Sequence, residues 1–179
     1  MINFDTNTYA PSACAVFRKS VDFYGALGNM SGGFPIVYKD KVWGSSEALY
    51  QAARYPHLPD LQEQIRTANN GFAAKLVAKA NYELSRPDWM DVRVTVMGIV
   101  IRLKFIAHTK VRNVIKTTME MPIVEYSARD PFWGAQPSAD LPLLVGQNVL
   151  GKLWEELRDN FENPLLPDGY LHQVEKFFG

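Results

Sequence analysis

One stretch of the chain, residues 43–54, combines a carboxylate, a guanidinium and large aromatic side chains. If the stretch is a helix, which turns about 100° per residue, one face carries Glu47, Tyr50, Gln51 and Arg54. A carboxylate held in a pocket can orient water or relay a proton. Aromatic rings beside a carboxylate and a guanidinium are typical of a lined pocket, and Trp43 lies just before this face. An amphipathic helix whose polar face lies in water would carry the same pattern.

A pair of lysines forms a second group of reactive side chains. Lys75 and Lys79 are four residues apart on a helix expected from Phe72 to about Glu83, so they share one face. Residues 69–71 (Asn-Asn-Gly) end the preceding helix and can cap this one. Each ammonium group disfavours the charge of the other, and the neutral amine is the nucleophilic form. The alternative is a solvated face on which Lys79 and Glu83 form a weak ion pair.

Two loops carry further candidates. Residues 25–34 are rich in glycine, which lets the backbone approach a ligand closely, and Asn29 and Ser31 add polar groups. Their spacing fits neither the dinucleotide fingerprint nor the P-loop, and an ordinary turn is the alternative. In residues 127–134, Asp130 is a second acid, although an aspartate before a proline is equally a turn former.

Helices and short strands must position these side chains. Ser45 and Ser46 are N-cap candidates for the helix that carries Glu47, and the helix dipole favours a carboxylate in the first turn. The apolar residues of 92–105 fit both the alternating pattern of a strand and one face of a helix, and the length of the segment favours the helix. A hairpin is expected over residues 36–43, and short strands over 15–17, 21–24 and 123–126. Further helices are expected over 60–68, 109–119, from Asn148 as N-cap to about 161, and over 171–178.

Composition restricts the broad class. Among 179 residues, 19 Lys and Arg balance 19 Asp and Glu, so no global basic field recruits nucleic acid, and any such substrate would need a local patch. The length fits a single domain with a substantial core. Cys14 is the only cysteine and the 3 histidines lack ligand spacing, so we expect no disulfide, no metal site and no cofactor. Without a signal layout or a membrane-spanning run, we expect a cytoplasmic protein with no membrane partner.

Several motifs occur in order along the chain: Ser46–Ala52 (SEALYQA), Arg86–Trp89 (RPDW), Asp130–Gly134 (DPFWG) and Gly146–Leu153 (GQNVLGKL). On these motifs the chain resembles the NADAR superfamily over roughly its whole length. The resemblance implies a compact, mostly α (α+β) single-domain fold with a few short strands, related to the YbiA-like N-glycosidases. It also implies a substrate whose ribose C1 carries an amine nitrogen.

The branch of the family determines the substrate that the resemblance implies. Residues 28–36 and 53–59 look more like the NADAR antitoxins paired with DarT-type toxins, which remove ADP-ribose from guanine bases in DNA. This similarity implies ADP-ribose and ADP-ribosylated DNA as ligands and a DarT-type toxin as partner. Cleavage of ribosylamine intermediates of riboflavin synthesis, as by YbiA-like members, and a non-catalytic ADP-ribose-binding module are the alternatives.

The resemblance also implies roles for single residues. Glu47 is the first choice for a carboxylate that stabilises an oxocarbenium-like state, and Asp130 is the second. Lys75 or Lys79 is expected to form a Schiff base with the sugar. Trp89 and Trp133 can stack on a purine, with core filling as the alternative. The other substrate-binding residues are expected to be Asn29, Ser31, Trp43, Gly146 and Asn148, with Arg54, Arg86 and Lys152 on a pyrophosphate.

Overall fold

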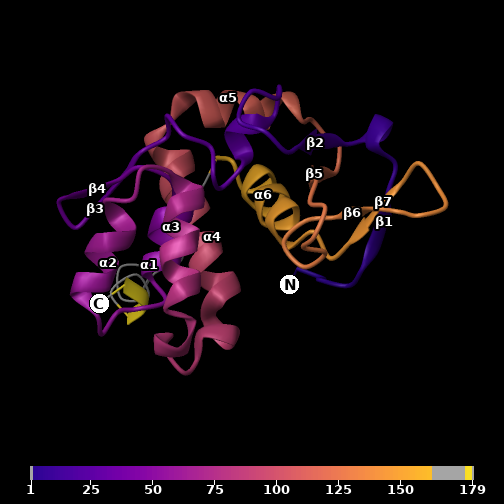
Figure 1. Cartoon of the computed structure of the whole chain (residues 1–179). Helices are drawn as coiled ribbons and strands as arrows, with labels where there is room; N and C mark the ends of the chain where they lie inside the picture. The colour runs from indigo at the N-terminus through magenta and orange to yellow at the C-terminus, as the bar shows by residue number, and fades with distance from the viewer. Residues whose placement is uncertain (1, 163–175, 179) are drawn as a thin grey trace. The chain divides into compact units, whose positions relative to one another are not determined.

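The computed structural model describes residues 2–162 and 176–178 (Figure 1). The chain divides into two compact units, which we call the strand-rich unit (Met1–Gly28 and Thr109–Pro164) and the helical unit (Asn29–His108 and Leu165–Gly179). Each unit joins segments that are distant in the sequence, so the two are not consecutive domains. The expectation of a single domain stays a prediction.

The helical unit is built around α1 (Ser46–Ala52), which packs against α2, α3 and α4 (Figure 1). Every residue of α1 is buried. The alternative of an amphipathic helix with its polar face in water is therefore wrong. The other elements of this unit are β3 (Ile36–Tyr38), β4 (Lys41–Trp43), α2 (Pro59–Arg66), α3 (Gly71–Ala80), η3 (Tyr82–Leu84) and α4 (Trp89–Ala107).

Side-chain caps begin α1 and α3 where the sequence predicts them. The Ser45 hydroxyl accepts a hydrogen bond from the backbone N–H of Ala48 at 3.2 Å. The Asn70 side chain accepts one from the N–H of Ala73 at 2.9 Å. Such a cap typically contributes about 1 kcal/mol, because it satisfies a donor that the first turn leaves free.

Residues 92–105, which are ambiguous in sequence, lie entirely within α4. Its consecutive residues from Val96 to Ile101 are all buried. A helical segment buried on all sides can be apolar all round, so its apolar residues also fit the alternation of a strand. Burial of these side chains outweighs the small helix penalty of the β-branched ones.

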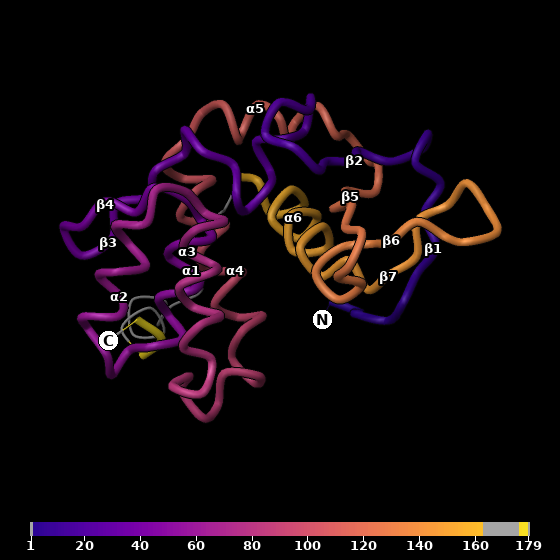
Figure 2. Tube along the Cα trace, viewed as in Figure 1, coloured from indigo at the N-terminus to yellow at the C-terminus, as the bar shows by residue number. Residues whose placement is uncertain are grey.

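The strand-rich unit contains an antiparallel sheet in the order β1-β7-β6 and a parallel pair, β2 with β5. The trace in Figure 2 shows β1 from the N-terminal segment beside β7 from the far end of the sequence. A small core of Tyr9, Val124, Ala135 and Leu144 joins the two strand systems. The elements are β1 (Asn7–Tyr9), η1 (Pro11–Ala13), β2 (Ala15–Phe17), η2 (Gly25–Leu27), α5 (Thr109–Thr117), β5 (Ile123–Glu125), β6 (Gln136–Pro137), β7 (Leu144–Gly146) and α6 (Val149–Asp159).

One local expectation in this unit is wrong, and a second is confirmed for the position of the residue but not for its side-chain bond. Residues 21–24 are turns rather than a strand, because the Asp22 carboxylate accepts hydrogen bonds from the backbone of Arg18 at 2.9 Å and Lys19 at 2.7 Å. Asn148 precedes α6 but makes no side-chain cap, and its φ of 51° places it in the left-handed region. Its side chain instead bonds to β5, as described below.

The fold class is α+β. Most helical residues belong to the helical unit and most strands to the strand-rich unit, so the expectation of a mostly α fold describes only one of the two units. Of the expected terminal helix over 171–178, only residues 176–178 lie in the described part, where they are helical. Within the described ranges, no helix combines the length and apolarity needed to cross a membrane.

Candidate active site

The carboxylate of Glu47 is buried and held by two amides. Its side chain is only 5% exposed. Asn29 Nδ2 donates to Glu47 Oε2 at 3.1 Å, and Gln51 Nε2 donates to Oε1 at 2.8 Å. The backbone N–H of Glu47 also donates to the carbonyl of Asn29 at 3.0 Å. The glycine-rich loop and α1 thus orient this carboxylate from two sides.

Glu47 has no cationic partner in the part of the chain that the structure describes: no lysine or arginine lies within ion-pair distance of its carboxylate. A buried carboxylate that no cation neutralises can stabilise positive charge that develops on a substrate. No three His, Cys, Asp or Glu side chains among residues 2–162 and 176–178 are grouped to hold a metal ion.

Several buried polar atoms on α1 and on the segments that flank or contact it lack a hydrogen-bond partner within the described chain. They are Asn29 Oδ1, Trp43 Nε1, Ser46 Oγ, Gln51 Oε1 and Arg54 Nε. A buried polar atom without a partner costs about 1–3 kcal/mol, and most folded proteins contain few of them. Their concentration around α1 indicates a place where polar groups are held ready for a ligand.

Aromatic rings and a guanidinium lie at the end of α1. The ring centroids of Tyr50 and Trp89 are 5.0 Å apart, and the guanidinium of Arg54 lies 4.8 Å from the Trp89 ring and 5.2 Å from the Tyr82 ring. Trp89 is 3% exposed, so it fills core as well as contacting Arg54. The structure therefore brings Tyr50, Arg54 and Trp89 together, as the sequence predicts.

The two lysines lie on α3, and both are exposed. α3 begins against Glu47: a Cβ added to Gly71 would lie 3.2 Å from the Cβ of Glu47. Lys75 follows Gly71 by one helical turn and Lys79 by two. Lys75 is therefore the lysine closer along α3 to the contact with Glu47, and the nucleophilic role of either lysine stays a prediction.

Three other predicted site residues, Arg86, Ser31 and Trp43, lie in the helical unit. Arg86 binds the Asp88 carboxylate at 2.6 and 2.9 Å and donates to the carbonyl of Phe177 at 3.2 Å, so its guanidinium is engaged within the protein. Ser31 is 5% exposed within the glycine-rich loop. Trp43 is 5% exposed and lines a cavity that is described below.

Asp130 and Trp133 belong to the strand-rich unit. Asp130 Oδ1 accepts hydrogen bonds from the backbone of Phe132 at 3.1 Å and of Trp133 at 3.0 Å, which is the contact pattern of a turn former. The indole of Trp133 is half-buried and packs edge-on against Phe132, with centroids 5.0 Å apart. Their roles as acid and stacking wall stay predictions.

The motif around Gly146 also has a structural explanation. A Cβ on Gly146 would lie 2.3 Å from the carbonyl oxygen of Gly134, so only glycine fits there. Asn148 Oδ1 accepts from the N–H of Glu125 at 3.0 Å, and its Nδ2 donates to the carbonyl of Ile123 at 2.8 Å. Both ends of this amide tie β5 to the start of α6.

Lys152 lies in an environment that disfavours a pyrophosphate. Its ammonium donates to the carbonyl of Asp5 at 2.8 Å, and desolvation lowers the pKa of this lysine. The cavity of about 500 Å³ that it lines also carries the carboxylates of Glu155, Glu156 and Asp159. Three carboxylates repel an anion, so we leave Lys152 out of the candidate active site.

The sequence analysis missed Lys104 of α4, which is fully buried. Burial lowers its pKa to about 7, and its ammonium lies 4.8 Å from the centre of the Phe34 ring in the glycine-rich loop. The same loop contacts α4 through Asn29 Nδ2, 3.2 Å from Met97 Sδ. The only signal in the sequence is a single lysine within an apolar run.

Lys104→Met is expected to stabilise the protein most near pH 6.5, and less as the pH rises toward 10. Below pH 7 the lysine is charged in both the folded and the unfolded chain; between about 7 and 10.5 the unfolded chain binds more protons, so stability rises with pH. The free energy of unfolding of the wild-type protein, relative to Lys104→Met, should rise by at most about 1.4 kcal/mol per pH unit. Urea unfolding of both proteins across this range measures it, with exposed Lys19→Met as control. A stability difference that does not vary with pH would contradict it.

The motif-bearing part of the chain matches a known family. A sequence profile of the NADAR domain matches residues 16–162, which include Glu47, both candidate lysines and Asp130. This chain belongs to the NADAR family. The fold is similar to the NMR structure of YbiA from E. coli, with a TM-score of 0.68 and 25% identity over 90% of this chain and 88% of that one.

Two relatives in this group have functional names. The N-glycosidase YbiA of Escherichia coli strain K12 is 29% identical over 143 residues, which are 80% of this chain and 85% of that protein. A riboflavin biosynthesis protein of Vibrio vulnificus is 30% identical over 127 residues, 71% of this chain. The match covers only 33% of the Vibrio protein, so the chain spans about a third of that relative.

Proposed function

We propose that this NADAR protein is an N-glycosidase that removes ADP-ribose from guanine bases in DNA and so counteracts a DarT-type ADP-ribosyltransferase. The observation that carries the proposal is the buried Glu47 carboxylate, oriented by Asn29 and Gln51 and without a cationic partner in the described chain. The loop 28–36 that supplies Asn29 is also the segment whose sequence looks most like the DarT-associated members.

The carboxylate suits cleavage of a bond between ribose C1 and an exocyclic amine. As the C1–N bond breaks, positive charge develops on C1 and the ring oxygen, and a fixed anion nearby stabilises it. Glu47 takes a proton from the attacking water, whose oxygen bonds to C1, and passes this proton to the departing guanine nitrogen, which restores the carboxylate. Because Asn29 and Gln51 already orient the carboxylate, little reorganisation is needed.

A second route through the same site uses a lysine of α3. The sugar ring opens to an imine at C1, the Lys75 amine replaces the guanine amine, and water later hydrolyses the Schiff base and restores the lysine. We prefer Lys75 because Gly71, one turn earlier, contacts Glu47. Glu47 would move the protons that these exchanges require.

Cyanoborohydride added during turnover is expected to trap this intermediate as a covalent ADP-ribose adduct on α3. Mass spectrometry of peptides locates the adduct, which should move or vanish in Lys75→Ala but persist in Lys79→Ala. Full activity of both variants with no adduct would remove the lysine from the mechanism and leave the carboxylate-and-water route.

A second candidate function is cleavage of a ribosylamine intermediate of riboflavin synthesis. The names of the relatives favour it, since one is an N-glycosidase YbiA and another a riboflavin biosynthesis protein. Its substrate also carries an amine nitrogen on ribose C1, so the same carboxylate would serve. A non-catalytic ADP-ribose-binding module is the third alternative.

One assay separates these functions. The protein is incubated with an oligonucleotide carrying ADP-ribosylated guanine and, separately, with a ribosylamine pyrimidine phosphate, and the released sugar is measured. We expect ADP-ribose release from the oligonucleotide and little release from the second substrate. Release only from the pyrimidine compound would favour the riboflavin reaction, and binding of ADP-ribose without release from either would favour the binding module.

A further inference from the structure

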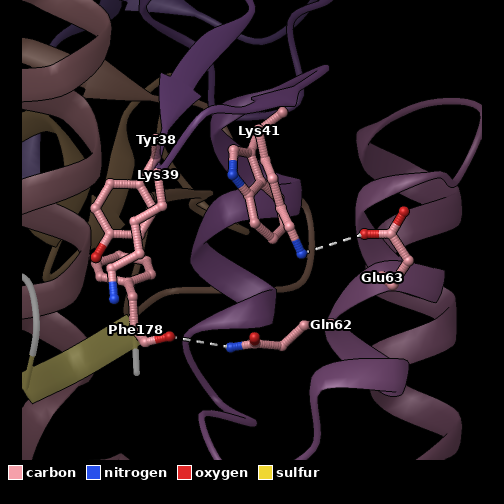
Figure 3. Close-up of a pocket in the computed structure, with 7 residues that line it drawn as sticks. Tyr38, Lys39, Lys41, Gln62, Glu63 and Phe178 are labelled. Atoms are coloured by element: carbon pink, nitrogen blue, oxygen red, sulfur yellow. Dashed lines mark hydrogen bonds and ion pairs between the residues drawn. The ribbon is translucent and has the colours of Figure 1, made fainter.

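A small cavity of the helical unit, about 110 Å³ in volume, lies beneath the β3–β4 hairpin (Figure 3). Three aromatic rings line it, together with two lysines at its hairpin side and two polar residues of α2. Figure 3 shows Tyr38, Lys39 and Lys41 descending from the hairpin, with Glu63 and Gln62 opposite on α2. The lining residues are Tyr38, Lys39, Lys41, Trp43, Gln62, Glu63 and Phe178.

The hairpin register explains why these side chains share one face. Tyr38 pairs with Lys41, and Ile36 with Trp43, so both pairs point to the same side of the two strands. The intervening pair, Val37 and Val42, points to the other side, where these residues are 67% and 54% exposed. The aromatic and basic side chains of the hairpin are thus directed together at α2.

The turn of the hairpin places a lysine where a smaller residue is usual. Lys39 and Asp40 have φ angles of 46° and 57°, and this two-residue turn with two positive φ angles favours Asn, Asp or Gly. A lysine in such a conformation is uncommon. Its position brings a second lysine to the lining of the cavity, with the ammonium 6.0 Å from the centre of the Tyr38 ring.

The ion pair of Lys41 at the cavity is weak enough for this lysine to meet an anion. Lys41 lies 3.7 Å from Glu63, and both side chains are about half exposed, so this ion pair is weak. Glu63 is held more closely by Arg66, whose Nε donates to it at 2.8 Å. The indole of Trp43 also lines the cavity, and its Nε1 is a buried donor without a partner in the described chain.

We propose that this cavity binds one nucleotide of a single-stranded DNA segment, with its base against the rings and its phosphate on Lys39 and Lys41. Aromatic rings beside basic side chains are the combination that binds unpaired strands, because every base offers a stacking face. A cavity this small is below the usual range of about 300–1,000 Å³ for whole small-molecule ligands, so it fits one base rather than ADP-ribose.

This inference rests on the proposed DNA substrate and deepens it. Formal net charge of the chain is 0, so strand binding needs a local basic patch. The hairpin carrying Lys39 and Lys41 leads through Trp43 directly into α1 and Glu47. The cavity would hold a nucleotide of the strand other than the one whose sugar bond is cleaved.

The test is binding of an unmodified, fluorescently labelled oligothymidylate of about 12 nucleotides, followed by anisotropy at several salt concentrations. Lys39→Ala/Lys41→Ala is compared with Lys19→Ala/Lys116→Ala, which removes the same charge from exposed positions of the other unit. We expect the hairpin variant to raise Kd about tenfold and to reduce the slope of log Kd against log salt concentration by about 0.7, the value for one lost phosphate contact on a single strand. The control variant should stay within about twofold of wild type.

Two further ligands test whether the cavity recognises a base and whether it binds a nucleotide within a strand or a free nucleotide. For the wild-type protein, an abasic strand of the same length should bind at least about fivefold more weakly. This factor corresponds to the lower end of the binding free energy that one stacked base contributes. Thymidine monophosphate should compete far more weakly than the strand. Equal binding of the abasic strand would exclude base recognition, and equal competition by the mononucleotide would make this a site for free nucleotides.

The inference is overturned if wild type does not bind the strand, or if both double variants lose affinity equally. Because this DNA is unmodified, binding is measured without turnover. Strand binding that depends on the hairpin lysines, together with no sugar release from ADP-ribosylated DNA, would overturn the proposed function and leave the inference standing.

Discussion

Glu47→Gln is expected to abolish sugar release while leaving the fold intact. The substitution keeps the shape of the side chain but removes the anion that would stabilise a positively charged transition state. We expect a loss in kcat of at least about a thousandfold, from both lost proton transfer and lost charge stabilisation. Affinity for ADP-ribose should stay within about tenfold of wild type, and single-turnover assays with binding measurements separate the two effects.

The surroundings of Glu47 explain why the fold should survive. A glutamine places an NH₂ group against the amide of Asn29 or Gln51, both of which donate to the carboxylate. Each of these amides has an oxygen without a partner in the described chain, so a rotated amide can accept from the new donor. Glu83→Gln, an exposed change in the same unit, is the control and should retain full turnover. Near-normal activity of Glu47→Gln would exclude the catalytic carboxylate.

Gly151→Ala is expected to destabilise the protein by about 3 kcal/mol or more, although alanine favours a helix over glycine by about 1 kcal/mol. Gly151 lies in the first turn of α6, where an added Cβ would lie 1.9 Å from the carbonyl oxygen of Ile123 and 2.4 Å from Asn148 Nδ2. The methyl group would therefore break the Asn148 bond to β5. For a chain of this length we expect the thermal midpoint to fall by about 6–12 °C.

Gly44→Ala is the matched control for this prediction. No heavy atom outside its neighbours lies within 4 Å of a Cβ added to Gly44, and its φ lies outside the positive range that side chains avoid. Its midpoint should stay within a few degrees of wild type. A Gly151→Ala protein that melts at or above the wild-type temperature would mean that α6 can move away from β5 at little cost.

The family motifs divide into a chemical part and a scaffolding part. In Ser46–Ala52, Glu47 and Gln51 form the buried polar cluster. In Asp130–Gly134 and Gly146–Leu153, the contacts of Asp130, Gly146 and Asn148 are backbone contacts that join a turn, β5 and α6. The sequence pattern alone does not separate these two uses, because both need polar residues and glycines at fixed positions.

The sequence by itself determined the elements whose signals are local. The Ser45 and Asn70 caps, the hairpin over 36–43 and the strand over 15–17 follow from short-range chemistry: a hydroxyl or amide next to free N–H groups, and a two-residue turn between alternating residues. The face of α1 that carries Glu47, Tyr50 and Gln51 follows from helical spacing alone.

Only the tertiary structure decided what surrounds those residues. Whether the polar face of α1 meets water or protein depends on α2, α3 and α4, which are separate segments of the chain. The same holds for Asn148, whose amide bonds to β5 instead of capping α6, and for Lys104, whose pKa falls because neighbouring elements remove water from it. Burial, and with it the charge and reactivity of a side chain, is a property of contacts between distant segments, and spacing along one segment does not contain it.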